Sequence, residues 1–412
     1  MSAPVALIRP RPAYLPLGSA ERRERSVRRR IGVAWALLVL NVMTYSGSIL
    51  PIPSIGGQLI TQGSLAAALL LLLSVNRRVV IRPTVFLCIV SLLPVEAIMS
   101  ATQGPTVGMI YRIVRLAEFV FALWLLTPWW GRRDLMLVRY HLITLSVVVS
   151  SVLLGLLLFP GRAMGNGRLA GVLWAIPPTQ VGHYAAVTMG LVVVLWLWGR
   201  ARGRTALIVC LVAGTTLVLS HTRTALAGLI LGVLIAALSM VVARARARKL
   251  FASAAAAAAV GILALSGFIG TYLSRGESTQ ELTKLTGRTT VWSALVSFPR
   301  DRFQEIFGFG LSNSSFNGLP IDSNWLASYQ EQGFFGVTVC AAILVFLLVA
   351  ACFQPRGVQR ALALFLVTYC LVASFTEVGF TDASTYLLEL GLAASLLVPP
   401  RVRHQPETAE NA

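Results

Sequence analysis

Residues 59–75 read LITQGSLAAALLLLLSV and are followed directly by Asn76, Arg77 and Arg78. The run contains no charged residue, and its leucines and alanines follow one another instead of alternating with polar residues. Inside a bilayer only helices and closed barrels satisfy their backbone hydrogen bonds, and barrel strands alternate apolar and polar residues. Because about 20 apolar residues cross a bilayer as a helix, this run predicts a membrane-spanning helix.

Similar runs recur along the whole chain. Of its 412 residues, 56% are hydrophobic and 12% are charged, which is about half the charged fraction of an average soluble domain. We therefore expect an all-α polytopic membrane protein with about 12 transmembrane helices. The predicted spans lie near residues 32–50, 58–75, 83–101, 110–128, 136–159, 180–198, 205–220, 224–243, 251–272, 334–353, 360–376 and 383–398.

The net charge of +19 would suggest a nucleic-acid partner in a soluble protein. Here most basic residues lie in short loops between apolar runs, so the charge indicates topology and no nucleic acid is predicted. Every short basic loop falls on the same side as the basic N-terminus. The excess of Arg and Lys in cytoplasmic loops therefore predicts that both termini are cytoplasmic.

The predicted organisation follows from this alternation. A basic cytoplasmic tail, residues 1–31, precedes transmembrane helices 1–9 in residues 32–272. A large extracytoplasmic loop, residues 273–333, leads to helices 10–12 in residues 334–398 and to a cytoplasmic tail, residues 399–412.

The loop contains the long polar interruption of the chain, residues 274–332. Its aromatic residues predict a small packed subdomain instead of a disordered linker. The segment carries GRTTVW at 287–292, DSNWL at 322–326 and EQGFFG at 331–336. Basic, acidic and aromatic residues beside a membrane surface suit an anionic, lipid-linked substrate.

Ionisable residues inside apolar runs are costly and often mark function. Arg112, Arg115 and Glu118 lie in the predicted fourth span, where the spacing of Arg115 and Glu118 would allow an ion pair. Such a pair would either hold the bundle together or take part in function, and the sequence favours neither interpretation. Glu96 and Glu389 are expected to be hydrogen-bonded packing residues.

Three arginines are predicted on the outer side. Arg223 lies in SHTRTA at 220–225, a short break between two runs, where a guanidinium can face a phosphate or simply snorkel at a helix end. Arg162 and Arg168 lie in the outer loop at 160–179, where basic residues are disfavoured, which favours an anionic ligand.

Several common chemistries have no motif in the sequence. We find no Walker loop, no HExxH, no GxSxG and no Cys/His cluster. The five cysteines all lie in apolar runs and are expected to be packing residues. No metal and no cofactor is therefore predicted, although His183 and His221 remain open as general bases.

With these segments in place, the chain resembles the O-antigen ligase and O-antigen polymerase family of bacterial membrane glycan transferases. The number and placement of spans and the late outer loop agree with that family. The segments that carry the likeness are 220–225, 287–292 with GFGL at 308–311, 322–336, and more weakly GRLAG at 167–171 with Pro177. The ligase form of the closing element usually begins with His, and here that position is Asp322, which favours polymerisation or another acceptor.

The resemblance implies a glycan donor on undecaprenyl diphosphate, a glycan or glycolipid acceptor, and a site at the outer face of the bacterial cytoplasmic membrane. Arg223 and Arg288, with Arg168 and Arg162 as further binding residues, would neutralise the diphosphate leaving group without a metal. Asp322 would be the general base that accepts the proton of the acceptor hydroxyl.

Ser323, Asn324 and Trp325 would orient the sugar, whereas Gly333 and Gly336 are expected to allow close helix packing. Ligase and polymerase activity remain alternatives. A lipid-linked sugar flippase or polysaccharide transporter is the main rival from another class, and a non-catalytic membrane scaffold is the third.

Overall fold

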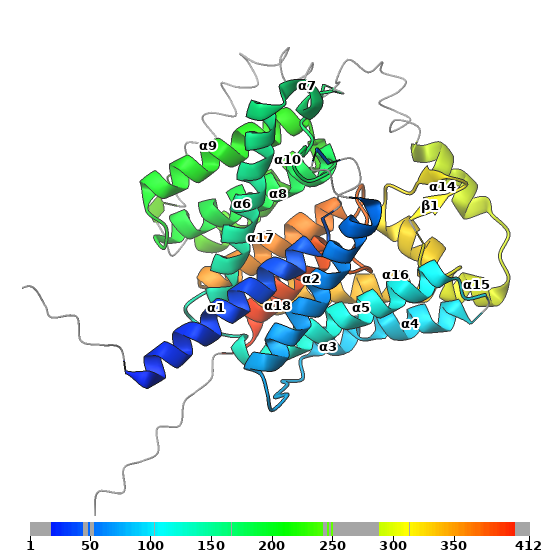
Figure 1. Cartoon of the computed structure of the whole chain (residues 1–412), viewed down its shortest axis with the longest axis horizontal. Helices are drawn as coiled ribbons and strands as arrows, with labels where there is room; N and C mark the ends of the chain where they lie inside the picture. Colours follow the sequence, from blue (N-terminus) through cyan, green and yellow to red (C-terminus); the bar gives the residue numbers. More distant parts are fainter. Residues whose placement is uncertain are drawn as a thin grey trace, which may run out of the picture.

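A computed structural model describes residues 18–43, 48–49, 53–102, 104–165, 167–241, 245–246, 249, 288–312 and 314–399. The described chain is mostly helical, with one two-stranded hairpin (Figure 1). Its first helices are α1 (Ser19–Leu40), α2 (Ser54–Val75), α3 (Val85–Val90), α4 (Leu92–Ala101), α5 (Val107–Leu126), α6 (Met136–Leu158) and α7 (Pro160–Ala163). A 3-10 turn at Thr127–Trp129 follows α5.

The later elements complete the bundle. The helices are α8 (Pro178–Trp198), α9 (Gly203–Ser220), α10 (Arg223–Met240), α14 (Arg288–Ser297), α15 (Arg302–Phe307), α16 (Asn324–Phe353), α17 (Val358–Ala373) and α18 (Thr385–Leu397). Strands β1 (Ser315–Phe316) and β2 (Leu319–Pro320) pair antiparallel, with Ser315 opposite Pro320.

Five described helices are long and apolar enough to cross a membrane, which supports the expected all-α membrane protein. They are Met136–Leu158, Pro178–Trp198, Gly203–Ser220, Arg223–Met240 and Asn324–Phe353. Shorter apolar helices occupy Leu59–Val75, Val85–Ala101, Val358–Ala373 and Thr385–Leu397. The predicted ninth span, 251–272, lies outside the described residues, and the number of about 12 spans remains a prediction.

Local sequence explains several helix ends. Thr84 begins α3 by accepting a hydrogen bond from the backbone N–H of Leu87, and Thr106 begins α5 by accepting one from Met109. Side-chain oxygens at these positions satisfy N–H groups that have no partner within the helix. Gly199 ends α8 in the left-handed conformation at φ 85°, which a glycine adopts without strain.

The centre of the bundle is formed by α17 and α18. Every residue from Thr385 to Leu396 is buried, and residues 361–370 of α17 are buried too. Helices α8 and α10 pack against α17 across glycines: a Cβ at Gly190 would overlap the Phe365 ring, and one at Gly232 would lie 2.9 Å from it. Small residues let helix backbones approach closely in membranes.

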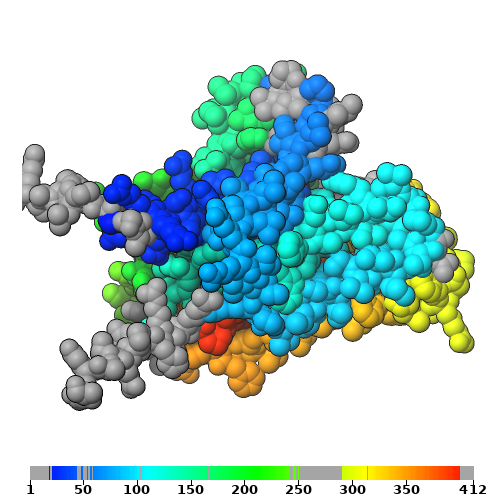
Figure 2. Space-filling model, turned by 60° about the horizontal axis from the view of Figure 1, so that its bottom comes forward, coloured from blue at the N-terminus to red at the C-terminus, as the bar shows by residue number. Residues whose placement is uncertain are grey.

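The basic segments at the start of α1 and between α5 and α6 lie at the same end of the bundle. The Arg28 guanidinium lies 2.9 Å from Glu24 and 3.1 Å from Asp134, and Arg132 lies 3.1 Å from Asp134. Gly131 donates to the Ser395 carbonyl near the end of α18. Figure 2 shows α1 and α2 in blue beside the cyan α3–α5 across one face. That this end of the bundle faces the cytoplasm remains a prediction.

The described part of the predicted outer loop has a small core of its own, formed by Leu295, Phe316, Ile321 and Ala327. These residues come from α14, the hairpin and the beginning of α16. In Figure 1 this segment, in yellow, lies at the end of the molecule opposite the start of α1. The aromatic residues of the loop therefore take part in a packed unit.

Candidate functional site

The segment that joins α17 to α18, residues 374–384, is the structural centre of the candidate site. It is held in shape by its own residues: Ser384 donates its hydroxyl to the Gly379 carbonyl and accepts from the backbone N–H of Leu387 at 3.2 Å. Gly379 has φ 122°, a conformation that residues with a side chain rarely adopt.

The beginning of α16 is bonded to this segment through residues that the sequence assigns to sugar binding. Asn324 is 1% exposed; its backbone N–H donates to the Ser374 carbonyl at 3.0 Å, and its Oδ1 accepts from the Phe380 N–H at 3.0 Å. Trp325 donates its indole N–H to the Ser374 hydroxyl at 3.1 Å. These polar atoms thus position the 374–384 segment. Asp322 lies half-buried two residues before Asn324, and Ser323 is buried.

The beginning of α10 meets the same segment. The hydroxyls of Thr224 and Thr376 lie 2.6 Å apart, and the half-buried Arg223 directly precedes Thr224 in the chain. Arg168 is bonded to the end of α9, where its Nε donates to the Ser220 carbonyl at 3.1 Å. The starts of α10 and α16 therefore meet at residues 374–376, and Arg223 and Asp322 are close in sequence to the residues that make these contacts.

Arg162 and Arg288 are less closely tied to this arrangement. Arg162 is exposed on α7. Arg288 is the first residue of α14, and α14 packs against α16. The guanidinium of Arg300, just after α14, donates to the Gln330 side chain at 2.7 Å and to the Leu295 carbonyl at 3.1 Å. Burial lowers the pKa of Arg300.

Arg115 bonds to residues other than Glu118, the partner that its spacing allows. The Arg115 Nε donates to Asn41 Oδ1 at 3.2 Å, and its Nη2 donates to the Asn41 carbonyl at 3.2 Å and the Ala383 carbonyl at 3.0 Å. The guanidinium thus joins α5 to the end of α1 and to the 374–384 segment. Tertiary acceptors replace the weak local pair because a carbonyl inside the bundle needs a donor.

A second group of contacts surrounds Glu331. One carboxylate oxygen accepts from the backbone N–H of Ser312 at 3.1 Å and of Ser314 at 2.7 Å, and from both hydroxyls. Phe309 and Gly310 donate to the carbonyls of Gln330 and Glu331 at 3.0 and 2.9 Å. These carbonyls accept bonds from outside the helix because α16 is interrupted at Gly333.

The expectation that Gly333 allows close packing is confirmed. A Cβ there would lie 2.4 Å from the backbone carbonyl of Ile306, and a Cβ at Gly308 would lie 2.4 Å from the backbone of Gln332. At Gly336 a Cβ would instead meet the Gln332 side chain of the same helix. The two glycines at 308 and 333 therefore let the end of α15 cross α16 backbone against backbone.

Beside Glu331 lies a surface cavity of about 430 Å³ between the start of α5 and the turn after α15. Arg112 lines it together with Thr106, Phe309, Ser312 and Gln330. Arg112 was recognised in the sequence as an unusual residue, but only the fold shows that it lines a cavity. Its basic and hydroxyl groups suit an anionic or sugar ligand.

A third group of polar residues lies in the core of the bundle. His141, His183 and Glu389 are 0%, 1% and 0% exposed. The Glu389 Oε1 lies 3.1 Å from His183 Nε2 and 3.6 Å from His141 Nε2. Glu389 was expected to be a hydrogen-bonded packing residue, and His183 was left open as a general base. No spacing in the sequence indicates that these three side chains meet.

Glu96 differs from its expectation too. The side chain is 1% exposed, and neither carboxylate oxygen has a hydrogen-bond partner, whereas a hydrogen-bonded packing residue was expected. Within the described residues, no group of three or more His, Cys, Asp or Glu side chains is arranged to hold a metal ion.

Comparisons of the chain with known protein families and with curated proteins find no match.

Proposed function

We propose that this protein transfers a glycan from an undecaprenyl-diphosphate donor to an acceptor hydroxyl at the outer face of the bacterial cytoplasmic membrane. The observation that carries the proposal is the meeting of two helix starts at residues 374–376. Thr224 bonds Thr376, and Asn324 bonds Ser374, so the starts of α10 and α16 share one small surface. This meeting supports a site that contains a cation and a carboxylate, because Arg223 directly precedes Thr224 and Asp322 lies two residues before Asn324.

The roles follow from charge. The leaving diphosphate develops negative charge, which arginines placed before the reaction stabilise without a metal. Arg223 and Arg288 take that role, with Arg168, Arg162 and Arg112 as further contacts. Asp322 accepts the proton of the attacking hydroxyl.

The test uses purified full-length protein in nanodiscs with undecaprenyl-diphosphate-linked oligosaccharide. Asp322→Asn should lower the rate by about 10²–10⁴, as removal of a general base does. Arg223→Ala should abolish transfer while the protein still elutes as a folded species. Glu305→Gln and Arg302→Ala, two exposed changes in α15, are the matched controls. Wild-type rates in Asp322→Asn and Arg223→Ala would refute the assignment.

Gel electrophoresis of the reaction products distinguishes the two transferase activities, polymerisation and ligation. A ladder of products indicates polymerisation, and a single shifted acceptor band indicates ligation. His221→Gln tests the other candidate base, which is half-buried at the α9–α10 turn. Loss of activity in His221→Gln with full activity in Asp322→Asn would move the base to that turn.

The buried His141–Glu389–His183 group favours a second candidate, a lipid-linked sugar flippase or polysaccharide transporter. Ionisable side chains paired inside a bundle are common in proton-coupled transporters. Deletion of residues 280–320 would not separate the two functions, because it removes the contacts of Glu331 and Gly333. Asp322→Asn separates them cleanly: a flippase should still translocate the lipid-linked sugar in proteoliposomes, whereas transfer should be lost.

A further inference from the structure

His141 is fixed in one protonation state by its neighbour on α1. Trp35 donates its indole N–H to His141 Nδ1 at 3.2 Å, and both side chains are buried. An indole N–H can only donate, so Nδ1 must be an unprotonated acceptor. The single proton of His141 then lies on Nε2, the nitrogen that faces Glu389 at 3.6 Å. A charged imidazolium would carry a proton on both nitrogens and would lose the bond from Trp35.

His183 has a different partner and is not restricted in this way. Its Nδ1 lies 3.1 Å from the Tyr369 hydroxyl, and its Nε2 lies 3.1 Å from Glu389 Oε1. A phenol hydroxyl can donate or accept. When His183 is neutral, Tyr369 donates to Nδ1. When His183 is charged, Nδ1–H donates to the Tyr369 oxygen instead. Both states keep a partner at both ring nitrogens.

The other groups around His183 are neutral or are already paired. The Tyr386 ring of α18 lies 4.2 Å from the imidazole, and the Tyr184 ring lies 5.3 Å away. Thr385 approaches Nε2 at 3.4 Å. On α17, Cys370 contacts the second oxygen of Glu389 at 3.8 Å.

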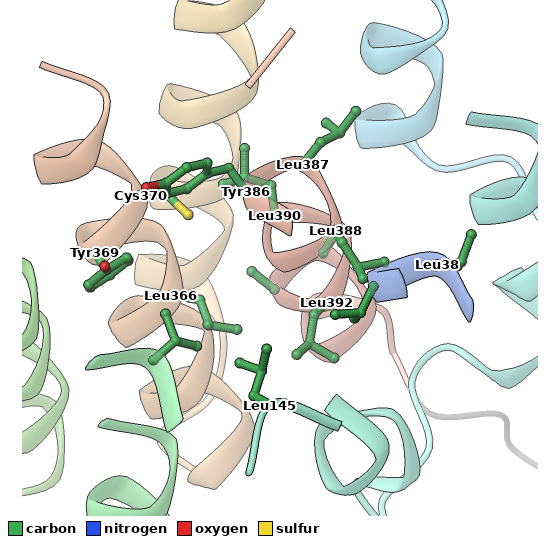
Figure 3. Packing of buried hydrophobic residues seen from close by; sticks show 14 of the residues in the cluster. Leu38, Leu145, Leu366, Tyr369, Cys370, Tyr386, Leu387, Leu388, Leu390 and Leu392 are labelled. Atoms are coloured by element: carbon green, nitrogen blue, oxygen red, sulfur yellow. The ribbon is translucent and has the colours of Figure 1, made fainter. Parts of the chain in front are cut away.

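The helices that face this cluster add little charge. From α10, Gly228 lies against the Tyr369 ring, and from α6 the ionisable neighbour is His141. Glu377, in the 374–384 segment, is near enough for its charge to act on Tyr369 and Tyr386. Figure 3 shows Tyr369 and Cys370 on α17 and Tyr386 on α18. Glu389 is therefore the carboxylate that directly contacts His183.

We propose that His183 is a reversible proton-binding site in the core of the bundle, with Glu389 as its counter-ion at 3.1 Å and with His141 held in its neutral form by the hydrogen bond from Trp35. A proton from water adds to His183 Nδ1, and the net charge of the cluster changes from −1 to 0. No other bond forms or breaks, apart from the reversal of the Tyr369 hydrogen bond. The inference does not depend on glycan transfer.

Aromatic rings connect His183 to the 374–384 segment. Tyr386 packs on His183 on one side and stacks on Phe380 at 4.9 Å on the other. The Phe380 N–H is the donor to Asn324. His183 is thus connected by two ring contacts to the 374–384 segment, which organises the candidate site.

The test is ¹⁵N NMR of the imidazole nitrogens in full-length protein in nanodiscs. The chain has four histidines, so His141→Gln, His183→Gln, His221→Gln and His404→Gln assign every signal. As the pH is lowered over the range in which the protein stays folded, His183 should change from one protonated nitrogen to two. His141 should keep a single proton on Nε2. A His183 that stays neutral while the helical circular dichroism persists would overturn the proposal, as would a titrating His141.

Two conservative variants keep the proposal testable if His183→Gln does not fold. Trp35→Phe removes the indole N–H but keeps a ring, so His141 should become a second titrating histidine. Tyr369→Phe removes the reversible partner of His183, so the midpoint of the His183 transition should move while His141 stays unchanged. If His141 in Trp35→Phe still carries one proton over the whole range, the tautomer argument is refuted.

Discussion

Replacing Gly333 with alanine tests the close crossing of α15 and α16. The backbone at Gly333 has φ 62° and ψ −161°, inside an otherwise helical segment. A Cβ would lie 2.4 Å from the carbonyl carbon and oxygen of Ile306 and 2.6 Å from the Phe307 nitrogen. These neighbours are backbone atoms, so no side-chain rotation can make room.

Two costs add at this position. A residue with a Cβ in this region of φ and ψ costs about 1–3 kcal/mol. Inserting a methyl group into a packed contact costs about 1–3 kcal/mol more. The Gly333→Ala protein should therefore lose about 2–6 kcal/mol of stability, a large part of the total for a folded domain.

The assay is the apparent melting temperature of detergent-purified protein, followed by size-exclusion chromatography after heating. Gly63→Ala is the matched control, because that glycine is exposed on α2 with open space where the Cβ would be. Gly336→Ala should also lower the melting temperature, since its Cβ would lie 2.3 Å from the Cβ of the buried Gln332 in the same helix, and side-chain rotation does not move a Cβ. If Gly333→Ala melts with Gly63→Ala, the backbone crossing is not as described.

Three further changes test the polar contacts. Glu331→Leu removes the oxygen that accepts these four hydrogen bonds, so the melting temperature should fall by an amount that corresponds to about 1–3 kcal/mol. Asn324→Leu leaves the buried Phe380 N–H without an acceptor and should cost about 1–3 kcal/mol, measured by chemical denaturation. The hydrogen bond to Arg28 lowers the pKa of Glu24, so this contribution is present above the ordinary Glu value and is lost as pH falls through the lowered value. Glu24→Gln should therefore melt slightly earlier than wild type at about pH 7 and together with it near pH 3; an equal difference at both pH values would contradict the assignment.

The position of most described helices could be predicted from the sequence. Apolar runs bounded by Gly, Pro or charged residues match α2, α6, α8, α9 and α10 within a few residues, because burial in lipid selects for them. The packing role of Gly333 could be predicted from its type as well. The conformation that makes it necessary could not, because it depends on where α15 docks.

Contacts between distant elements could not be predicted in this way. The spacing of Arg115 and Glu118 allows an ion pair because it brings two side chains together on any helix. The acceptors at Asn41 and Ala383 come from elements far away in sequence, and periodicity does not say which faces meet. The proximity of His141, His183 and Glu389 could not be predicted for the same reason. In the sequence, each of them is a single polar residue in an apolar run.

The central position of α17 and α18 has a consequence for biosynthesis. These helices are synthesised after α1–α16, yet they contribute the buried surface against which α8 and α10 pack. Until α17 and α18 are inserted, Gly190 and Gly232 face lipid, and His183 lacks both Tyr369 and Glu389. A chain that stops before residue 358 would lack the packing partners of α8 and α10 and would leave His183 without Tyr369 and Glu389. Such chains are expected to be substrates for membrane proteases, so the yield of mature protein should depend on how quickly α17 and α18 are inserted.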